Sequence, residues 1–233
     1  MDLVFNKREN LKKELLEVSK NFQNKVWESL DTTQKTQAME NLNEFLSEKF
    51  KIEPSPELVE FFSINVKQMG GYVPETHELK VSISNGCNGE EFADTIAHEI
   101  RHAYQCKKSD ELKKYEEKYK ELDEKRDTNT VKSFKEALFG FVWKNFNKKK
   151  QEEEELRRKM DLRIEAILLN PKNENLKGIR DNLENYIRAE EDFEQYYAQL
   201  VEEDARDFAD AFCSFCFPEN PNEPQKEKIL DYF

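Results

Sequence analysis

The stretch from Asn88 to Gln105 reads NGEEFADTIAHEIRHAYQ, and it decides how the middle of the chain folds. Asn88 followed three residues later by Glu91 is a helix-start signal, because such side chains satisfy backbone N–H groups of a first turn. Apolar residues then recur at helical spacing, at Phe92, Ile96, Ile100 and Ala103. The pattern predicts an amphipathic helix from about residue 88 to about residue 105 with one buried face.

Two histidines lie four residues apart within this helix. Side chains at this spacing project from one helix face, so the imidazoles of His98 and His102 can both reach one Zn²⁺ at about 2 Å. Glu99 directly follows the first histidine, where its carboxylate can take a proton from a zinc-bound water. A chance match is the alternative, but the motif uses two of the chain's three histidines and lies within a capped helix. We predict a zinc site with Glu99 as its general base.

The segments before this helix show both helical and strand patterns. Two helices are expected within residues 1–50, from apolar residues at helical spacing: Leu11, Leu15, Val18 and Phe22, then Met39, Leu42, Leu46 and Phe50. Alternation of apolar and polar residues predicts two strands, at 59–66 and 79–84. Residues 70–74 break the chain between them, and Asn85-Gly86 turns it out of the second strand. A small sheet therefore precedes the metal-binding helix.

The segments after this helix are charged and helical. Several apolar stripes after Cys106 predict an inserted helical hairpin or subdomain, in which Pro171-Lys172-Asn173 closes the arm. A final amphipathic section ends before Pro218, with its apolar positions at Leu183, Ile187, Phe193, Tyr197, Val201, Ala205 and Phe208.

These patterns predict an α+β fold that is predominantly helical. Its expected parts, in chain order, are N-terminal helices (1–53), a small sheet with the active-site helix (54–106), a helical insertion (107–190), a second ligand helix (191–217) and a C-terminal tail (218–233).

Charge and cysteine usage limit the partners and the compartment. The chain has 37 Lys and Arg against 49 Asp and Glu, a formal net charge of −12, which repels nucleic acid and anionic lipid. No signal peptide or transmembrane segment is recognisable, so we expect a cytoplasmic, soluble protein with neither nucleic acid nor membrane as partner. Cys213 and Cys216 have the spacing of a metal or redox pair, but their apolar surroundings favour buried structural thiols. His77 lies in a polar segment and is interpreted as an exposed turn residue.

A catalytic zinc takes three protein ligands and leaves one position for water. No third histidine follows at the spacing of the metzincins. The downstream stretch that best fits a second ligand-bearing helix runs from Tyr196 to Ala209. It is acidic on one side and has small residues at Ala205 and Ala209. Small residues let two helices approach closely, so this stretch is where we expect the third ligand.

The two motifs together resemble the gluzincin class of zinc peptidases. They are His98-Glu99-Ile100-Arg101-His102 and Glu202-x-x-Ala205-x-x-Phe208-Ala209. More narrowly, they are similar to small intracellular zincin-like metallopeptidases found among phage-associated, repressor-cleaving and toxin-like proteins. The resemblance covers residues 59–105 and 196–212. It implies a minimal zincin-like core in which two helices share one metal and strand 79–84 forms the sheet edge that binds an extended peptide.

The resemblance also implies that Glu202 is the third ligand. Two features depart from the family pattern. Arg206 stands where the pattern has Asn or Asp, a group that would orient a ligand histidine. Glu203 offers a competing register, because Asp207 follows it by four residues as in other gluzincins. We favour Glu202 over Glu203.

The expected function is a zinc-dependent metallopeptidase acting on a protein or peptide. Tyr72, Tyr196 and Tyr197 are candidates for stabilising the oxyanion, although each also fits a packing role. One alternative is a helical protein-interaction module with a structural or inactive zinc site, for which Cys106 is the nearest fourth ligand. Another is a zinc amidase or deacylase acting on a non-protein substrate. An open fourth metal position and the role of Glu99 distinguish these readings.

Overall fold

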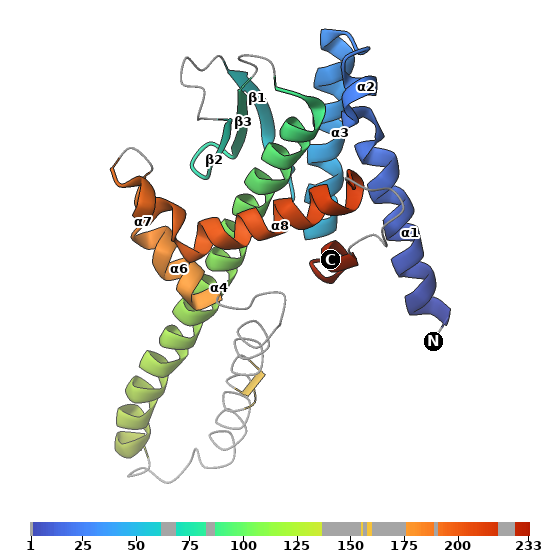
Figure 1. Ribbon diagram of the computed structural model, residues 1–233. Coiled ribbons are helices and arrows are strands. Elements are labelled where there is room, and N and C mark those ends of the chain that lie inside the picture. Colours follow the sequence, from blue (N-terminus) through green and yellow to red (C-terminus); the bar gives the residue numbers. More distant parts are fainter. Residues whose placement is uncertain are drawn as a thin grey trace. The chain divides into compact units, whose positions relative to one another are not determined.

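The computed structural model describes residues 2–61, 69–82, 87–136, 155, 158–159, 176–188, 191–218 and 227–233. The chain divides into two compact units, one formed by residues 1–107 with 178–233 and the other by residues 108–177. Helices dominate, and one small mixed sheet accompanies them (Figure 1). The predicted α+β, predominantly helical fold is confirmed. Among the described helices, none is both long enough and apolar enough to span a membrane.

The N-terminal segment is mainly helical. Helix α1 spans Asp2–Ser19, followed by the 3₁₀ helix η1 (Lys20–Phe22), α2 (Asn24–Trp27) and α3 (Thr32–Phe50). Leu15, Phe22, Leu42 and Leu46 are fully buried in the core, as their helical spacing predicts. The short elements η1 and α2 between the two long helices were not predicted.

The sheet has three strands in the order β1-β3-β2. Strands β1 (Glu57–Phe61) and β3 (Glu78–Ser82) are parallel, and β2 (Gly70–Val73) pairs antiparallel with β3. Two predictions are therefore wrong. The expected chain break at 70–74 contains a strand, and the expected edge strand at 79–84 lies in the centre of the sheet. A tight turn at 74–77 folds β2 back onto β3, so β3 has a neighbour on each side.

Several predicted features lie outside the described residues. They are the end of the first predicted strand (62–66), the turn at Asn85-Gly86, and most of the predicted insertion including Pro171-Lys172-Asn173.

Helix α4 spans Gly89–Glu136 and carries the histidine motif. Asn88 and Glu91 cap it reciprocally: the Asn88 backbone N–H donates to Glu91 Oε2 (2.8 Å) and the Glu91 N–H donates to Asn88 Oδ1 (3.0 Å). The predicted apolar stripe is buried, with Ile96 and Ile100 fully inaccessible. The helix continues past residue 105, where the apolar stripe was expected to end it. No Gly or Pro follows Gly89 before Gly140, so no residue forces it to stop.

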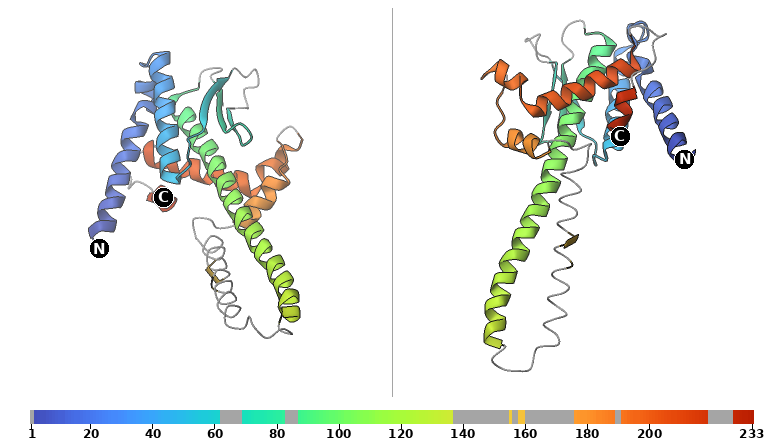
Figure 2. Two further views of the ribbon diagram at one scale, coloured as in Figure 1. Left: turned by 180° about the vertical axis from the view of Figure 1, so that it is seen from behind. Right: turned by 60° about the horizontal axis from the view of Figure 1, so that its bottom comes forward.

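The final section forms three helices rather than one continuous stretch: α6 (Leu176–Glu184), α7 (Phe193–Tyr197) and α8 (Leu200–Cys216). Helix α8 ends before Pro218 as predicted, and it buries Phe208, Phe212 and Phe215 completely. The 3₁₀ helix η4 (Glu227–Asp231) lies beside α8 (Figure 2). Within the first unit, the sheet packs on the first part of α4. Helix α8 crosses the same part of α4 (Figure 1). The two segments that carry the sequence motifs are thus in contact.

Candidate metal centre

Two helices bring three candidate ligands together. His98 and His102 lie one turn apart on α4, and Glu202 lies in the first turn of α8. One ligand atom from each residue lies within 4.8 Å of the others. The Nε2 atoms of the two histidines are 3.0 Å apart, His98 Nε2 is 3.3 Å from Glu202 Oε2, and His102 Nε2 is 3.5 Å from Glu202 Oε1. A tetrahedron with bonds of about 2 Å has edges of about 3.3 Å, so the spacing suits zinc.

The Glu202 carboxylate is the most constrained group in this cluster. The residue is completely buried, and its Oε1 accepts a 2.7 Å hydrogen bond from the hydroxyl of Tyr186. Its Oε2 is buried with no hydrogen-bond partner in the structure. Burial alone raises the pKa of Glu202, but contacts with His102, His98 and Tyr186 outweigh it and hold that pKa far below its usual range. A buried, ionised carboxylate beside two imidazoles, with one oxygen that accepts no hydrogen bond, fits a cation.

The protonation of His102 is set by its neighbours. Its Nδ1 lies 2.9 Å from Gln105 Oε1, and an amide oxygen only accepts, so Nδ1 carries a proton and Nε2 faces the cluster. Burial lowers the pKa of His102, whereas the hydrogen bond and charge of Glu202 and the charge of Glu99 raise it, to about 9. The negative charge that favours a proton on this imidazole would equally favour a metal cation there.

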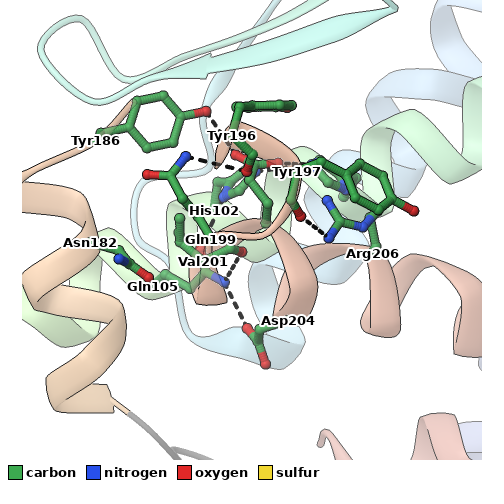
Figure 3. Close-up of polar contacts among 12 residues, drawn as sticks. His102, Gln105, Asn182, Tyr186, Tyr196, Tyr197, Gln199, Val201, Asp204 and Arg206 are labelled. Atoms are coloured by element: carbon green, nitrogen blue, oxygen red, sulfur yellow. Dashed lines mark hydrogen bonds and ion pairs between the residues drawn. The ribbon is translucent and has the colours of Figure 1, made fainter. Parts of the chain in front are cut away.

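Gln105 connects this histidine to the second helix. Its amide nitrogen donates to the Val201 carbonyl (3.0 Å) and to Asp204 Oδ2 (2.7 Å), which assigns its oxygen to His102 (Figure 3). Asp204 also accepts two hydrogen bonds from the buried guanidinium of Arg101, at 2.7 and 2.8 Å. Arg101 therefore forms an ion pair with the second helix. Gln105 and Asp204 thus fix the ring of His102 to both helices.

Arg206, the departure from the family pattern, does not orient a histidine. Its guanidinium lies 3.7 Å from the ring centre of Tyr197 and donates to the Tyr197 carbonyl (Figure 3). The group that orients His102 is Gln105, three residues further along the same helix. Sequence reasoning missed this role, although a Gln one turn after a ligand histidine was a readable signal.

Glu99, on α4, is packed against strand β2 of the sheet. The residue is 7% exposed, and its Cγ would lie 3.3 Å from a Cβ placed on Gly70 of β2. The same Cβ would lie 2.5 Å from Thr95 Cγ2 and 2.9 Å from the Lys80 carbonyl oxygen. The absence of a side chain at residue 70 is therefore what lets β2 approach α4 closely and hold Glu99 beside the cluster.

Replacing Gly70 with alanine should separate β2 from α4. We expect Gly70→Ala to lower the free energy of unfolding by about 1–3 kcal/mol, because the new methyl overlaps both a side chain and a backbone oxygen. Gly71→Ala is the matched control, since its Cβ would meet no atom within 4 Å, and its effect should stay within about 0.5 kcal/mol. Urea unfolding measures both. An equal decrease in the free energy of unfolding in the two variants would contradict the close approach of β2 to α4 at residue 70.

The remaining predicted residues lie elsewhere. Glu203 is exposed, and in the part of the chain that the structure describes the cluster contains neither Glu203 nor Cys106. His77 lies in the predicted turn but is partly buried, with its ring nitrogens 2.8 Å from the Tyr72 hydroxyl and from the Pro54 carbonyl oxygen.

The cysteine pair on α8 does not form a metal cluster among the described residues. Cys216 is buried, with its Sγ 3.9 Å from the Leu15 carbonyl oxygen. Cys213 is partly buried, with its Sγ 3.7 Å from Asp94 Oδ1. Burial and the charge of Asp94 raise the pKa of the Cys213 thiol, so it is protonated at neutral pH.

Of the tyrosines considered from the sequence, Tyr196 is in contact with the Glu202 carboxylate. It interacts with Glu202 through a hydrogen bond and through charge. Tyr72 bonds to His77, and Tyr197 stacks with Arg206. Tyr186 was missed altogether, because nothing in the local sequence connects it with a residue on α8. Burial and the charge of Glu202 raise the pKa of both Tyr186 and Tyr196, so both hydroxyls remain hydrogen-bond donors.

Comparisons with known proteins add no identification: no family model matches this sequence, and no curated protein or solved structure does. A functional interpretation therefore depends on the residues of the cluster and on their surroundings.

Proposed function

We propose that this protein is a zinc-dependent metallopeptidase in which His98, His102 and Glu202 hold the metal and Glu99 is the general base. The observation that carries the proposal is the buried Glu202 carboxylate, whose two oxygens lie 3.3 and 3.5 Å from the imidazoles of His98 and His102 on another helix and whose Oε2 lacks a hydrogen-bond partner. Two histidines and one glutamate are the ligand set typical of gluzincin-type catalytic zinc, which the sequence motifs also resemble.

The chemistry divides between the metal and the residues around it. Zinc, when bound, would polarise the scissile carbonyl and lower the pKa of a bound water to about 7. Glu99, which follows His98 directly, would accept the proton of the attacking water and return it to the leaving amine. Its side chain is buried against β2. Tyr196, whose hydroxyl interacts with Glu202 and is affected by the charge of Glu99, is the best placed donor for a developing oxyanion.

The sheet supports a peptide as substrate, but the strand that would pair with the peptide differs from the one expected. Strand β2, not the strand at 79–84, is the edge of the sheet that packs beside Glu99. An extended peptide can add to an edge strand through main-chain hydrogen bonds, and this pairing would align its backbone with the metal. A Cβ on Gly71 would meet no atom within 4 Å, so the strand is uncrowded at this residue.

The number of ligands favours catalysis over a structural metal. Among the described residues the cluster has three protein ligands, and Cys106 is not one of them. A structural zinc needs a fourth protein ligand, whereas a catalytic one keeps that position for water or substrate. An amidase or deacylase would use the same chemistry and differs only in its substrate.

The test combines metal analysis with a substrate screen. We expect one zinc per chain by elemental analysis, and cleavage within a proteome-derived peptide library by the purified protein that a chelator stops and added zinc restores. A zinc-loaded protein that leaves the library intact but hydrolyses N-acylated small molecules would support the amidase instead. A protein that takes up no zinc would refute the metallohydrolase and leave the helical interaction module.

A further inference from the structure

We infer that Tyr186 is a positioning residue of the metal site: its hydroxyl holds Glu202 Oε1, and so determines that Oε2 is the oxygen that ligates the metal. This inference rests on the proposed zinc site. It assigns a role to a residue that lies outside both sequence motifs, and it explains how a single glutamate offers one oxygen to the metal.

The two oxygens of Glu202 have different surroundings. Oε1 accepts the 2.7 Å hydrogen bond from Tyr186 and lies 3.5 Å from His102 Nε2, whereas Oε2 lies 3.3 Å from His98 Nε2 and has no hydrogen-bond partner. A carboxylate without the tyrosine could rotate and present either oxygen, or both, to a cation. The Tyr186 hydroxyl opposes that rotation, because it forms a strong hydrogen bond to Oε1 of an ionised carboxylate with which Tyr196 also interacts.

The backbone around Tyr186 is tied to the beginning of α8, the helix that carries Glu202. The side chain of Gln199, the residue that precedes α8, accepts from the Ile187 N–H at 3.0 Å and donates to the Ile187 carbonyl at 2.9 Å. Asn182 Oδ1 accepts from the Leu200 N–H at 2.9 Å (Figure 3). These hydrogen bonds fix the backbone near Tyr186 relative to the backbone near Glu202. The distance between the Tyr186 hydroxyl and the Glu202 carboxylate therefore does not depend on side-chain conformation alone.

The exposure of the Tyr186 ring distinguishes a positioning role of this residue from a packing role. Tyr186 is 42% exposed, and it meets Tyr196 edge to face with ring centres 6.1 Å apart. A half-exposed ring contributes little to the core, whereas its hydroxyl reaches a completely buried carboxylate. The effect of the residue on the site is thus expected to come from the hydroxyl, which Tyr186→Phe removes while keeping the ring.

The experiment measures the zinc dissociation constant by competition with a chromophoric chelator, on the wild type, Tyr186→Phe and Tyr197→Phe. We expect Tyr186→Phe to weaken zinc binding 10- to 100-fold, the usual effect of removing a group that orients a ligand. Tyr197→Phe is the control, because its ring keeps its stacking on Arg206, and it should bind zinc within about twofold of wild type. The d–d absorption bands of the cobalt-substituted protein should change only in Tyr186→Phe, since they report ligand geometry.

Each outcome is decisive. Equal zinc affinity and equal cobalt spectra in the wild type and Tyr186→Phe would overturn the inference but leave the zinc site standing. Reduced hydrolysis with unchanged zinc affinity would make Tyr186 a catalytic donor, and would likewise overturn the positioning role. A wild-type protein that binds no zinc would overturn the proposed function and this inference together.

Discussion

Replacement of Glu202 with alanine is expected to abolish stoichiometric zinc binding. In the proposed site this residue is the ligand from α8, and without it the two histidines of α4 are the only members of the cluster that remain among the described residues. The loss of affinity should exceed the 10- to 100-fold effect of removing a residue that only orients a ligand. Elemental analysis of the purified variant, after reconstitution with zinc, measures the result.

The stability of the protein provides a second readout of the same change. Zinc at 100 times its dissociation constant should stabilise the wild type by about 2.7 kcal/mol, because only the folded state binds it. Glu202→Ala should gain no such stabilisation when zinc is added.

Glu203→Ala is the matched control for Glu202→Ala. Residue 203 is exposed and lies outside the cluster, so its replacement should retain one zinc per chain. The reverse result, with zinc lost from Glu203→Ala and kept in Glu202→Ala, would assign the ligand to the competing register and contradict the observed geometry.

Replacement of Glu99 with glutamine is expected to leave the zinc content unchanged and to reduce peptide hydrolysis about 10²- to 10⁴-fold. Glutamine has the same shape as glutamate, so the close packing against Gly70 is kept, but an amide cannot accept the proton of the attacking water. The measurement is kcat/KM on a peptide recovered from the library screen, together with metal analysis of the same preparation.

The control here is Glu203→Gln, which removes the same formal charge from an exposed position next to a ligand. It should retain most of the activity, and this would exclude a general electrostatic effect as the cause of the loss. Full activity in Glu99→Gln would remove the assignment of the general base. Loss of zinc from Glu99→Gln would instead show that residue 99 helps to hold the metal.

Features set by local periodicity were predictable from the sequence. The capped start of α4, its buried stripe and the common face of His98 and His102 all depend on a helical repeat within one element. The same reasoning found the N-terminal helices and the end of α8 before Pro218. Glu202 was singled out only through its resemblance to a family pattern, and the structure places it against both histidines.

Features that depend on pairing between distant segments were not predictable. Strand order is one of them, because the alternation in residues 79–84 shows that a strand exists but not how many neighbours it has. The division of the last section into α6, α7 and α8 is another, since the break before α8 coincides with the bonds between Gln199 and Ile187.

The amino-acid sequence by itself determined that this chain is mainly helical and that one helix presents two histidines and a glutamate in a metal-binding spacing. Only the tertiary structure decided which groups surround them. The bond between Arg101 and Asp204 joins residues 103 positions apart, and the bond from Tyr186 to Glu202 joins two separate segments. The physical reason is that periodicity encodes which face of an element is buried, whereas the partner of each buried polar group depends on how the elements pack.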